Sequence, residues 1–386
     1  MGGRPVGLDT MRVDYFHRGG PRGEVMTLDR VSNDGPWPGS LTQLIDNTAL
    51  GKYFFEVIDI ASARVLYSRG FASIYGEWET TPEVRTTGRT FHESLRFPWP
   101  DVPVRIMLRK RDERNAFRDL WTADVDPRTV SRTGPPRVGR VVSLLGSGSP
   151  ATKVDLLLIS EGYTAEQLPR FRADASRLVE ALFALEPFKA RRLDFNVRLL
   201  EIAGSRTSVE FNIFGIERYA LTYDNRALRD LAASAPYDAI AILVNERKYG
   251  GGGIFNQLST VAAANGAAEY VFIHEFAHNL AGLADEYVGN VTYETGAPQR
   301  VEPWEPNLTA LLDPAALKWR DLVEAGTSIP TPLAQAGKVG AFEGGGYEAR
   351  NLYRPEAECI MGSRKAVPFC RVCQRAISRI IDLHSK

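Results

Sequence analysis

The sequence of 386 residues predicts a multidomain α+β protein, in which an N-terminal β-sandwich domain precedes an α/β domain. Three observations lead to this fold class. Residues 11–126 read as short strands separated by turn clusters, without a long amphipathic helix. Residues 127–152 are rich in Pro, Gly and Ser, and beyond them apolar strands alternate with helical periodicity. The expected organisation is a first domain at 1–126, a linker at 127–152 and a second domain at 153–386.

Alternating β-branched and aromatic residues predict the strands of the first domain. Because successive side chains of a strand point to opposite faces, the alternation places the apolar ones on the face that a second sheet covers. Several short strands of this kind are typical of a β-sandwich. The strands are expected at 53–58, 64–67, 90–97 and 104–108.

The second domain is predicted to alternate strands and helices. A continuous apolar run at 154–159 suits a central strand that is covered on both faces. Residues 164–185 have helical spacing after Thr164, whose side chain can cap the first turn. Further strands are expected at 195–202 and 237–244, and a short helix at 226–233.

Composition and charge restrict the classes of partner. The chain carries 47 basic and 47 acidic side chains, so its net charge favours neither nucleic acid nor an anionic membrane surface. It contains no run of about eighteen apolar residues, and we expect no membrane span. The N-terminal residues lack the apolar core of a signal peptide. The protein is therefore expected either to stay in the cytoplasm or to follow a signal that has been removed.

The stretch 274–287 carries the strongest functional pattern, His-Glu-Phe-Ala-His-Asn-Leu-Ala-Gly-Leu-Ala-Asp-Glu-Tyr. On a helix, His274 and His278 project from the same face, and both can bind one Zn²⁺ through nitrogen at about 2.0–2.1 Å. Glu275 lies beside them and can take a proton from a metal-activated water. The chain has only five histidines, so chance is a poor explanation of this spacing. The pattern indicates a zinc hydrolase.

The third zinc ligand is expected shortly after the helix. Gly282 can adopt the left-handed conformation that ends a helix and returns the chain toward the metal. In metzincin peptidases the third ligand follows such a glycine by three residues. Here the helix runs one residue longer before Gly282, and Asp285 stands in place of the histidine. Glu286 is the alternative ligand, or a residue that orients a ligand histidine.

The glycine run at 250–253 does not predict a phosphate-binding loop, because no Lys-Ser or Lys-Thr pair follows it. We expect it to form a flexible turn that leads into an extended segment at 256–263. In zinc peptidases a segment at this place can serve as an edge strand that pairs with the substrate backbone.

The three cysteines, Cys359, Cys370 and Cys373, all lie near the C-terminal end of the sequence. They do not describe a disulfide framework. Cys370 and Cys373 form a single C-x-x-C pair, and a zinc ribbon requires a second pair. The pattern therefore favours a local disulfide or simple packing over a second zinc site.

Taken together, these segments resemble the M64 metallopeptidases, the IgA peptidase family, over nearly the whole chain. The zinc stretch 274–287 is the strongest part of the resemblance. The other parts are 11–17, 67–71 with Glu77 and Trp78, Glu161-Gly162-Tyr163, Tyr353-Arg354-Pro355, Cys359-Ile360-Met361 and 369–373.

The resemblance implies an N-terminal β-domain of the M64 type and a metzincin-like catalytic domain with a single zinc ion. It implies peptide-bond hydrolysis and, as in many members, export to the periplasm or the exterior. His274, His278 and Asp285 would bind the metal, and Glu275 would be the general base. Met361 would form a methionine turn beneath the metal. The sequence is equally consistent with a methionine that only fills a gap in the core.

A phenol is expected to stabilise the oxyanion, with Tyr353 as the first candidate and Tyr287 as the second. The function predicted is that of a zinc-dependent endopeptidase acting on a protein or peptide. One alternative is a zinc amidase that cleaves a cell-wall peptide or another non-protein amide. A second alternative is a binding protein with a vestigial zinc site, whose β-domain recognises a glycan or a protein.

Overall fold

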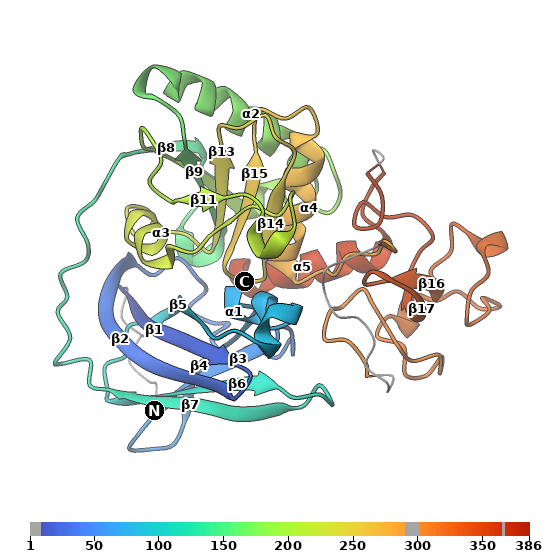
Figure 1. Cartoon of the computed structure of the whole chain (residues 1–386), viewed down its shortest axis with the longest axis horizontal. Helices are drawn as coiled ribbons and strands as arrows, with labels where there is room; N and C mark the ends of the chain where they lie inside the picture. Colours follow the sequence, from blue (N-terminus) through green and yellow to red (C-terminus); the bar gives the residue numbers. More distant parts are fainter. Residues whose placement is uncertain (1–8, 290–300, 365–366) are drawn as a thin grey trace.

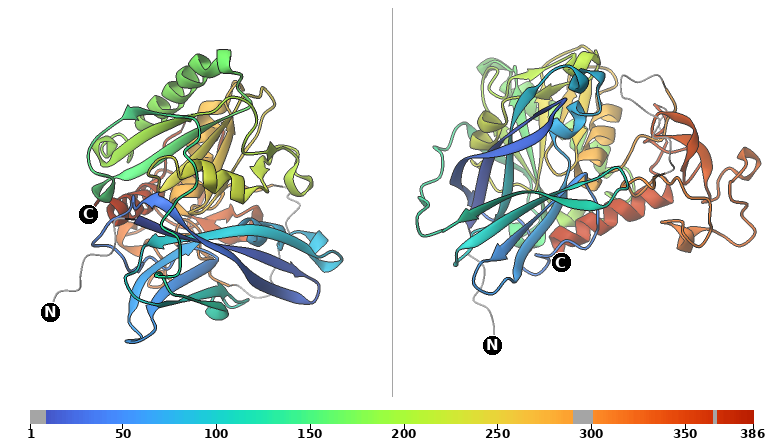
Figure 2. Two further views of the ribbon diagram at one scale, coloured as in Figure 1. Left: turned by 90° about the vertical axis from the view of Figure 1, so that its left-hand side faces the viewer. Right: turned by 60° about the horizontal axis from the view of Figure 1, so that its bottom comes forward.

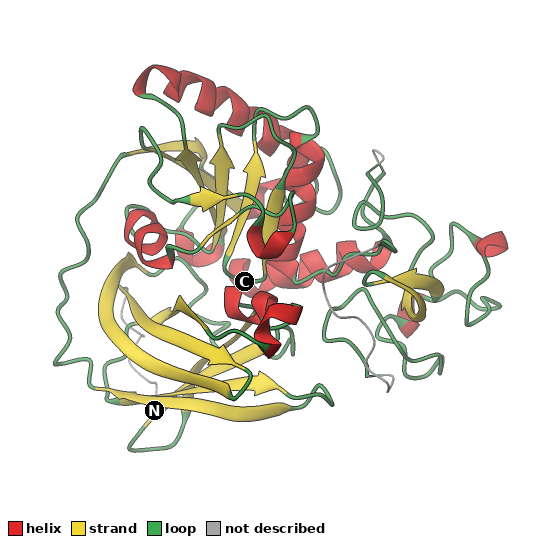
Figure 3. Cartoon of the chain, in the orientation of Figure 1, coloured by secondary structure: helices red, strands yellow, loops and turns green. Residues whose placement is uncertain are grey.

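The computed structural model describes residues 9–289, 301–364 and 367–386. Within these ranges the chain has an α+β fold with several separate sheets. A strand-rich N-terminal region, blue in Figure 1, lies against an α/β region that contains the long helices. Residues 301–364 form an extension beside the α/β region, and Figure 3 shows that most of this extension is loop.

Two antiparallel sheets make up the N-terminal region, as the sequence predicts. The first sheet has the order β2-β1-β5 and the second the order β4-β3-β6-β7. Each of the four segments expected as strands overlaps one of β3, β4, β5 and β6. The bounds are β1 Asp9–Gly20, β2 Gly23–Pro36, β3 Tyr53–Asp59, β4 Val65–Phe71, β5 Arg89–Pro98, β6 Val104–Arg111 and β7 Phe117–Val125, with a short helix α1 at Ile74–Trp78.

The two N-terminal sheets share one hydrophobic core. Met11, Val13 and Tyr15 occupy alternate positions of β1 and are fully buried against Phe55 and Val57 of β3. Burial of each large apolar side chain contributes roughly 1.5–3 kcal/mol. The period of two in the sequence therefore corresponds to an inner face that both sheets bury.

A six-stranded sheet forms the centre of the α/β region, in the order β14-β15-β13-β9-β10-β8. The four inner strands are parallel to one another, and both edge strands are antiparallel to their neighbours. Every residue of β9 is buried, as expected for a central strand. The bounds are β8 Arg140–Leu145, β9 Val154–Glu161, β10 Phe195–Glu201, β13 Ala239–Val244, β14 Gly251–Ile254 and β15 Leu258–Ala262.

The helices pack around this sheet, and two small sheets complete the region (Figure 2). Helix α4 contacts β13, β14 and β15 as well as α2 and α5. The bounds are α2 Leu168–Phe183, α3 Asn225–Ala232, α4 Ala268–Ala281 and α5 Arg371–Ser385, with β11 Val209–Glu210 paired to β12 Leu221–Thr222 and β16 Phe342–Gly345 paired to β17 Glu348–Arg354. Short 3₁₀ turns occur at Pro82–Arg85, Pro150–Thr152, Ala165–Gln167, Arg192–Asp194, Ile213–Gly215, Arg320–Leu322 and Leu333–Gln335.

The segment expected as a linker, 127–152, contains strand β8. This strand pairs with β10 and forms one edge of the central sheet. The residues between β7 and β8 have no regular structure, which agrees with their Pro and Gly content. The connection between the two regions is therefore shorter than the segment rich in Pro, Gly and Ser.

The glycine run is an edge strand, so the expectation of a flexible turn at 250–253 is wrong. Gly251 and Gly253 belong to β14, and the segment expected at the edge forms β15, one strand further in. A Cβ atom on Gly253 would lie 2.3 Å from the Glu275 carbonyl oxygen, and one on Gly251 would lie 2.6 Å from Val271. Glycine is required here because helix α4 lies directly against the strand.

Buried charged groups join the N-terminal region to the α/β region. The guanidinium of Arg12 pairs with Asp34 at 2.7 Å and also with Asp230, which lies in α3. The Tyr237 hydroxyl donates to Asp34 at 2.8 Å. Arg12 and Asp34 both belong to the N-terminal region, so the buried Tyr237 hydroxyl and the partly exposed Asp230 carboxylate are the groups that tie the α/β region to this pair. No described helix is long and apolar enough to cross a membrane.

Candidate active site

Helix α4 positions the two histidines of the site. The helix is buried on nearly all sides, and His274 and His278 lie one turn apart on it. Gly282 ends the helix with φ +59°, and a Cβ atom there would approach the Trp304 ring to 2.8 Å. The left-handed glycine lets the chain reverse, so that Asp285 returns to the histidines.

The three residues predicted as metal ligands meet at one point. The Nε2 atoms of His274 and His278 lie 3.0 Å apart. Asp285 Oδ1 is 2.9 Å from the first nitrogen and 3.4 Å from the second. Glu286, the alternative ligand, points away into a separate cluster. The structure therefore brings Asp285 to the histidine pair, although the two acids are adjacent in sequence.

The other ring nitrogens show which protons the imidazoles carry. His278 Nδ1 lies 2.5 Å from the carbonyl oxygen of Leu283, and His274 Nδ1 lies 3.4 Å from that of Ile360. A carbonyl oxygen only accepts hydrogen bonds, so both Nδ1 atoms are the donors. Both Nε2 atoms then direct a lone pair at the same point as the Asp285 carboxylate.

This donor set fits a divalent cation such as Zn²⁺. Asp285 Oδ1 makes no hydrogen bond among the described residues and faces the two Nε2 atoms, while Oδ2 accepts from the Tyr347 hydroxyl. Burial disfavours a charged imidazole, yet Asp285 outweighs it and raises the pKa of His278 to about 9. Burial also opposes ionisation of Asp285, but the imidazoles hold its pKa well below the ordinary value. A positive charge between the two Nε2 atoms and the Asp285 carboxylate is therefore strongly favoured.

Glu275 lies next to the ligand set on the same helix and faces a cavity. Burial raises the pKa of Glu275, and the neighbouring imidazoles oppose that rise only in part. A carboxylate whose pKa is moved toward neutrality is suited to accept and then release a proton.

A cavity of about 890 Å³ opens over this cluster. Its walls come from three parts of the chain: Glu77 from α1, Glu275 and β14 from the α/β region, and Trp304 and Tyr347 from the extension. Cavities that bind ligands commonly have volumes of about 300–1,000 Å³. The cavity can therefore accept a substrate larger than a single amino acid.

Comparison with known families identifies both regions. The family model described as IgA Peptidase M64 matches residues 142–337 and 333–381. The model described as Peptidase M64 N-terminus matches residues 5–122. The chain belongs to the IgA peptidase M64 family. No curated protein matches the chain closely enough to be recognised as a relative.

Membership of the M64 family makes the protein a metallopeptidase, with a protein or peptide as its substrate. The family implies a metal ion in this M64 peptidase, and the cluster of His274, His278 and Asp285 is a donor set that fits one. The resemblance inferred from the short segments of the sequence is thus confirmed.

The two tyrosines that the sequence offers for the oxyanion lie in different surroundings in this M64 peptidase. Tyr353 is 5% exposed, packs with Leu317 and Ala341, and does not line the cavity. Tyr287 lines the cavity, and its hydroxyl accepts from Arg218 Nη2 at 3.2 Å. Position near Met361 in the sequence does not bring Tyr353 to the site.

The turn at Ile360 and Met361 contacts both His274 and the segment that carries Asp285. Met361 is fully buried, and its carbonyl oxygen accepts from the Glu286 backbone at 2.8 Å. The preceding residue, Ile360, supplies the carbonyl oxygen next to His274. The turn at Met361 therefore supports both helix α4 and the segment that carries Asp285.

Sequence reasoning did not find three residues on the cavity wall: Glu77, Arg218 and Tyr347. Glu77 was noted only as part of the resemblance. Arg218 and Tyr347 lie in loops with no motif of their own, and only the folded chain brings them to the site.

Proposed function

We propose that this M64 peptidase is a zinc-dependent endopeptidase. His274, His278 and Asp285 would hold the zinc ion and Glu275 would act as the general base. The observation that carries the proposal is the convergence of three lone-pair donors beside Glu275 at the wall of a large cavity. Three protein ligands leave a coordination position free, as in other catalytic zinc sites.

Each residue of the cluster has a separate task in the proposed reaction. Zinc, when bound, polarises the scissile carbonyl and lowers the pKa of water to about 7. Glu275 takes a proton from the attacking water and passes it to the leaving amine. The Tyr347 hydroxyl, which donates to Asp285, holds the carboxylate oriented toward the histidines.

Tyr287 and Arg218 are the proposed donors to the oxyanion. Both line the cavity, and the Arg218 guanidinium donates to the Tyr287 hydroxyl. The Arg218 guanidinium places positive charge beside the phenol, at the point where negative charge would develop. The pair replaces Tyr353 in this role, because Tyr353 does not reach the cavity.

Strand β14 is the proposed site for the substrate backbone. Gly251 and Gly253 line the cavity next to Glu275, at the edge of the central sheet. The outer edge of β14 is already paired at Gly251, whose amide donates to the Arg218 carbonyl and whose carbonyl accepts from Ala220. An extended peptide would therefore pair at Gly253 and bring its scissile bond to the zinc ligands. The N-terminal region contributes Glu77 to the wall of the same cavity, so it would take part in substrate binding rather than act as a separate module. The family resemblance also supports an exported enzyme.

Replacement of the proposed general base tests the mechanism. Glu275→Gln is expected to retain zinc and to lower kcat by about 10²–10⁴-fold, since the amide cannot accept a proton. Zinc content measured by mass spectrometry and cleavage of a peptide library would be determined together. Glu269→Gln is the matched control, because Glu269 lies on the same helix with an exposed side chain. Undiminished cleavage by Glu275→Gln would reject the mechanism, and activity confined to cell-wall peptides would favour the amidase.

A further inference from the structure

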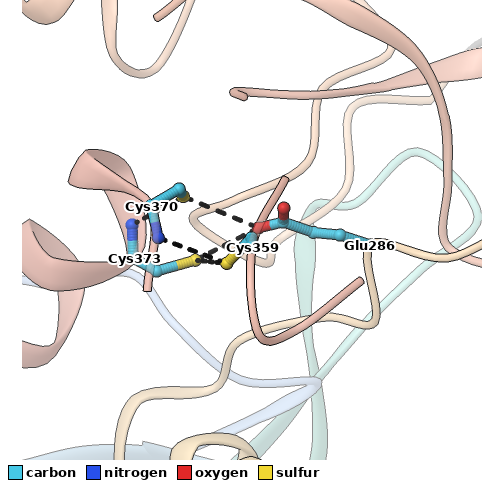
Figure 4. Close-up of side chains that lie close together, drawn as sticks. All are labelled: Glu286, Cys359, Cys370 and Cys373. Atoms are coloured by element: carbon cyan, nitrogen blue, oxygen red, sulfur yellow. Dashed lines mark hydrogen bonds between the residues drawn. The ribbon is translucent and has the colours of Figure 1, made fainter. Parts of the chain in front are cut away.

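A second group of potential metal ligands lies behind the proposed catalytic site. Glu286, Cys359, Cys370 and Cys373 each offer one ligand atom, and these atoms all lie within 4.8 Å of one another. Figure 4 shows the four side chains gathered between the start of α5 and the segment that carries Glu286. All four residues are buried.

The distances in this group match a tetrahedral site. The sulfur atoms of Cys359 and Cys373 are 3.8 Å apart. Tetrahedral Zn–S bonds of about 2.3 Å place two sulfur atoms about 3.8 Å apart, whereas a disulfide bond is only about 2.05 Å long. Glu286 Oε1 lies 3.1 Å from Cys373 Sγ and 3.8 Å from Cys370 Sγ. A zinc ion with one oxygen ligand requires sulfur–oxygen distances of about 3.6 Å, between these two values.

One carboxylate oxygen of Glu286 has no hydrogen-bond partner although the side chain is buried. Its side chain is 1% exposed, Oε1 accepts from Asn307 at 2.8 Å, and Oε2 has no hydrogen-bond partner. Within the described ranges, no Lys, Arg or His side chain lies at ion-pair distance from Glu286, and Arg354 acts on it only as a more distant charge. A buried carboxylate without a cation is costly, and a metal ion would offset that cost.

The backbone around the cysteines favours thiolates. The amide of Cys370 donates to Cys359 Sγ at 3.3 Å, and the amide of Cys373 donates to Cys370 Sγ at 3.4 Å. Cys370 is also the N-cap of α5, where the free amides of a long helix stabilise negative charge. Thiolates together with a carboxylate make a soft donor set that selects zinc over magnesium or calcium.

We propose that Glu286, Cys359, Cys370 and Cys373 bind a structural zinc ion that is distinct from the catalytic one. Four protein ligands close the tetrahedral shell, so the ion has no position for water or substrate. Metal binding at this site does not depend on the proposed peptidase mechanism.

The structural ion would join three segments that support the catalytic ligands. Glu286 directly follows Asp285, Cys359 directly precedes Ile360, and the remaining two ligands lie at the start of α5. The Ile360 carbonyl oxygen contacts His274, and Asp285 completes the histidine cluster. The ion would thus hold both contacts at a fixed distance. This second role rests on the proposed function of the histidine cluster.

Zinc content in two variants separates the two sites. We expect about two zinc ions per wild-type chain and about one in a His274→Ala, His278→Ala double variant. X-ray absorption at the zinc edge of the double variant should show a shell dominated by sulfur at about 2.3 Å. Because its four proposed ligands are intact, this variant tests the site without disturbing it. A double variant without zinc, or a zinc shell of nitrogen and oxygen only, would overturn the proposal.

Thiol chemistry gives a second test on the wild-type protein. The three cysteines are free in the structure. With zinc bound, their thiols should not react with a maleimide. They should react once the protein has been unfolded in the presence of a chelator. The intact mass should show no loss of hydrogen. A mass lower by two hydrogens would indicate a disulfide and would reject the zinc site. If wild type and double variant each hold one sulfur-bound zinc, the structural ion stands and the catalytic one fails.

Discussion

The two clusters take their carboxylates from adjacent residues, Asp285 and Glu286, and differ in what surrounds them. Asp285 joins two imidazoles at the wall of an open cavity, whereas Glu286 joins three thiols in the interior. The open cluster offers three ligands and leaves room for solvent, and the closed cluster offers four. The comparison teaches that access to solvent, rather than metal-binding capacity, separates a site suited to catalysis from one suited to structure.

The largest effect is expected when the open cluster loses a ligand. His278→Ala should abolish cleavage, with a fall in kcat/KM of at least about 10⁴-fold, because both metal affinity and activation of water are lost. One sulfur-bound zinc ion should remain. Peptide cleavage and zinc content of the same preparation would measure both. Retained activity with a single zinc would place catalysis elsewhere and break the comparison.

Loss of a ligand from the closed cluster should affect stability first. Cys373→Ser is expected to lower the stability by roughly 3 kcal/mol, a fraction of the 10–16 kcal/mol seen for zinc-finger peptides. Calorimetry should record a Tm lower by roughly 4 °C, since the entropy of unfolding grows with the length of the chain. The histidine-bound zinc should persist at low temperature. An unchanged Tm would show that no ion is held there.

The two tyrosines provide a matched pair for the oxyanion. Tyr287→Phe should lower kcat by about 10²-fold with little change in KM, since its hydroxyl acts on charge that develops in the transition state. Tyr353→Phe should leave kcat unchanged, because Tyr353 lies outside the cavity. Steady-state kinetics on one peptide would decide, and equal losses in the two variants would argue against a specific role for Tyr287.

The glycines of β14 test how closely helix α4 must approach the sheet. Gly253→Ala is expected to destabilise the protein by about 1–3 kcal/mol, because the new methyl group would lie 2.3 Å from the Glu275 carbonyl oxygen. Gly266→Ala is the control, since nothing lies within 4 Å of a Cβ atom at Gly266. Urea unfolding of both variants gives the difference. Equal stability would show that the strand and the helix can separate without cost.

The smallest effect concerns Glu77 on the N-terminal wall of the cavity. Burial raises the pKa of Glu77 from 4.5 to about 7, with His278 opposing the rise. A raised carboxyl pKa favours the folded state below about pH 4.5, and this contribution is lost as the pH rises through about 7. Glu77→Gln should therefore stabilise the protein at pH 8, by about 1 kcal/mol or less after solvent screening. The gain in stability should vanish at pH 4.5. Measurements of Tm for both proteins at pH 8 and pH 4.5 would test this. An equal gain at the two pH values would contradict the raised pKa of Glu77.

The cluster of His274, His278 and Asp285 could be predicted from sequence because its geometry is local. His274 and His278 are one helical turn apart, and Gly282 marks the helix end that returns Asp285. The order of apolar and polar residues likewise predicts most strands. Local spacing is enough to predict these features because side-chain directions repeat with a fixed period along a helix or a strand.

The closed cluster could not be predicted, because its members meet only through the tertiary fold. Glu286 and Cys359 are far apart in sequence, and the C-x-x-C pair by itself favours a local disulfide or simple packing. The edge position of β14 was missed for a similar reason. Its glycines serve contact with α4, which no local pattern records. For Tyr353, nearness to Met361 in sequence does not determine which way a strand residue points.

Strand β8 has a practical consequence for producing the catalytic half of the protein by itself. A fragment that starts at residue 153 would lack β8 and leave without partners those backbone groups of β10 that face β8. Bare edges of this kind recruit strands from neighbouring molecules and promote aggregation. A fragment of the peptidase half that does not aggregate therefore has to begin upstream of Arg140.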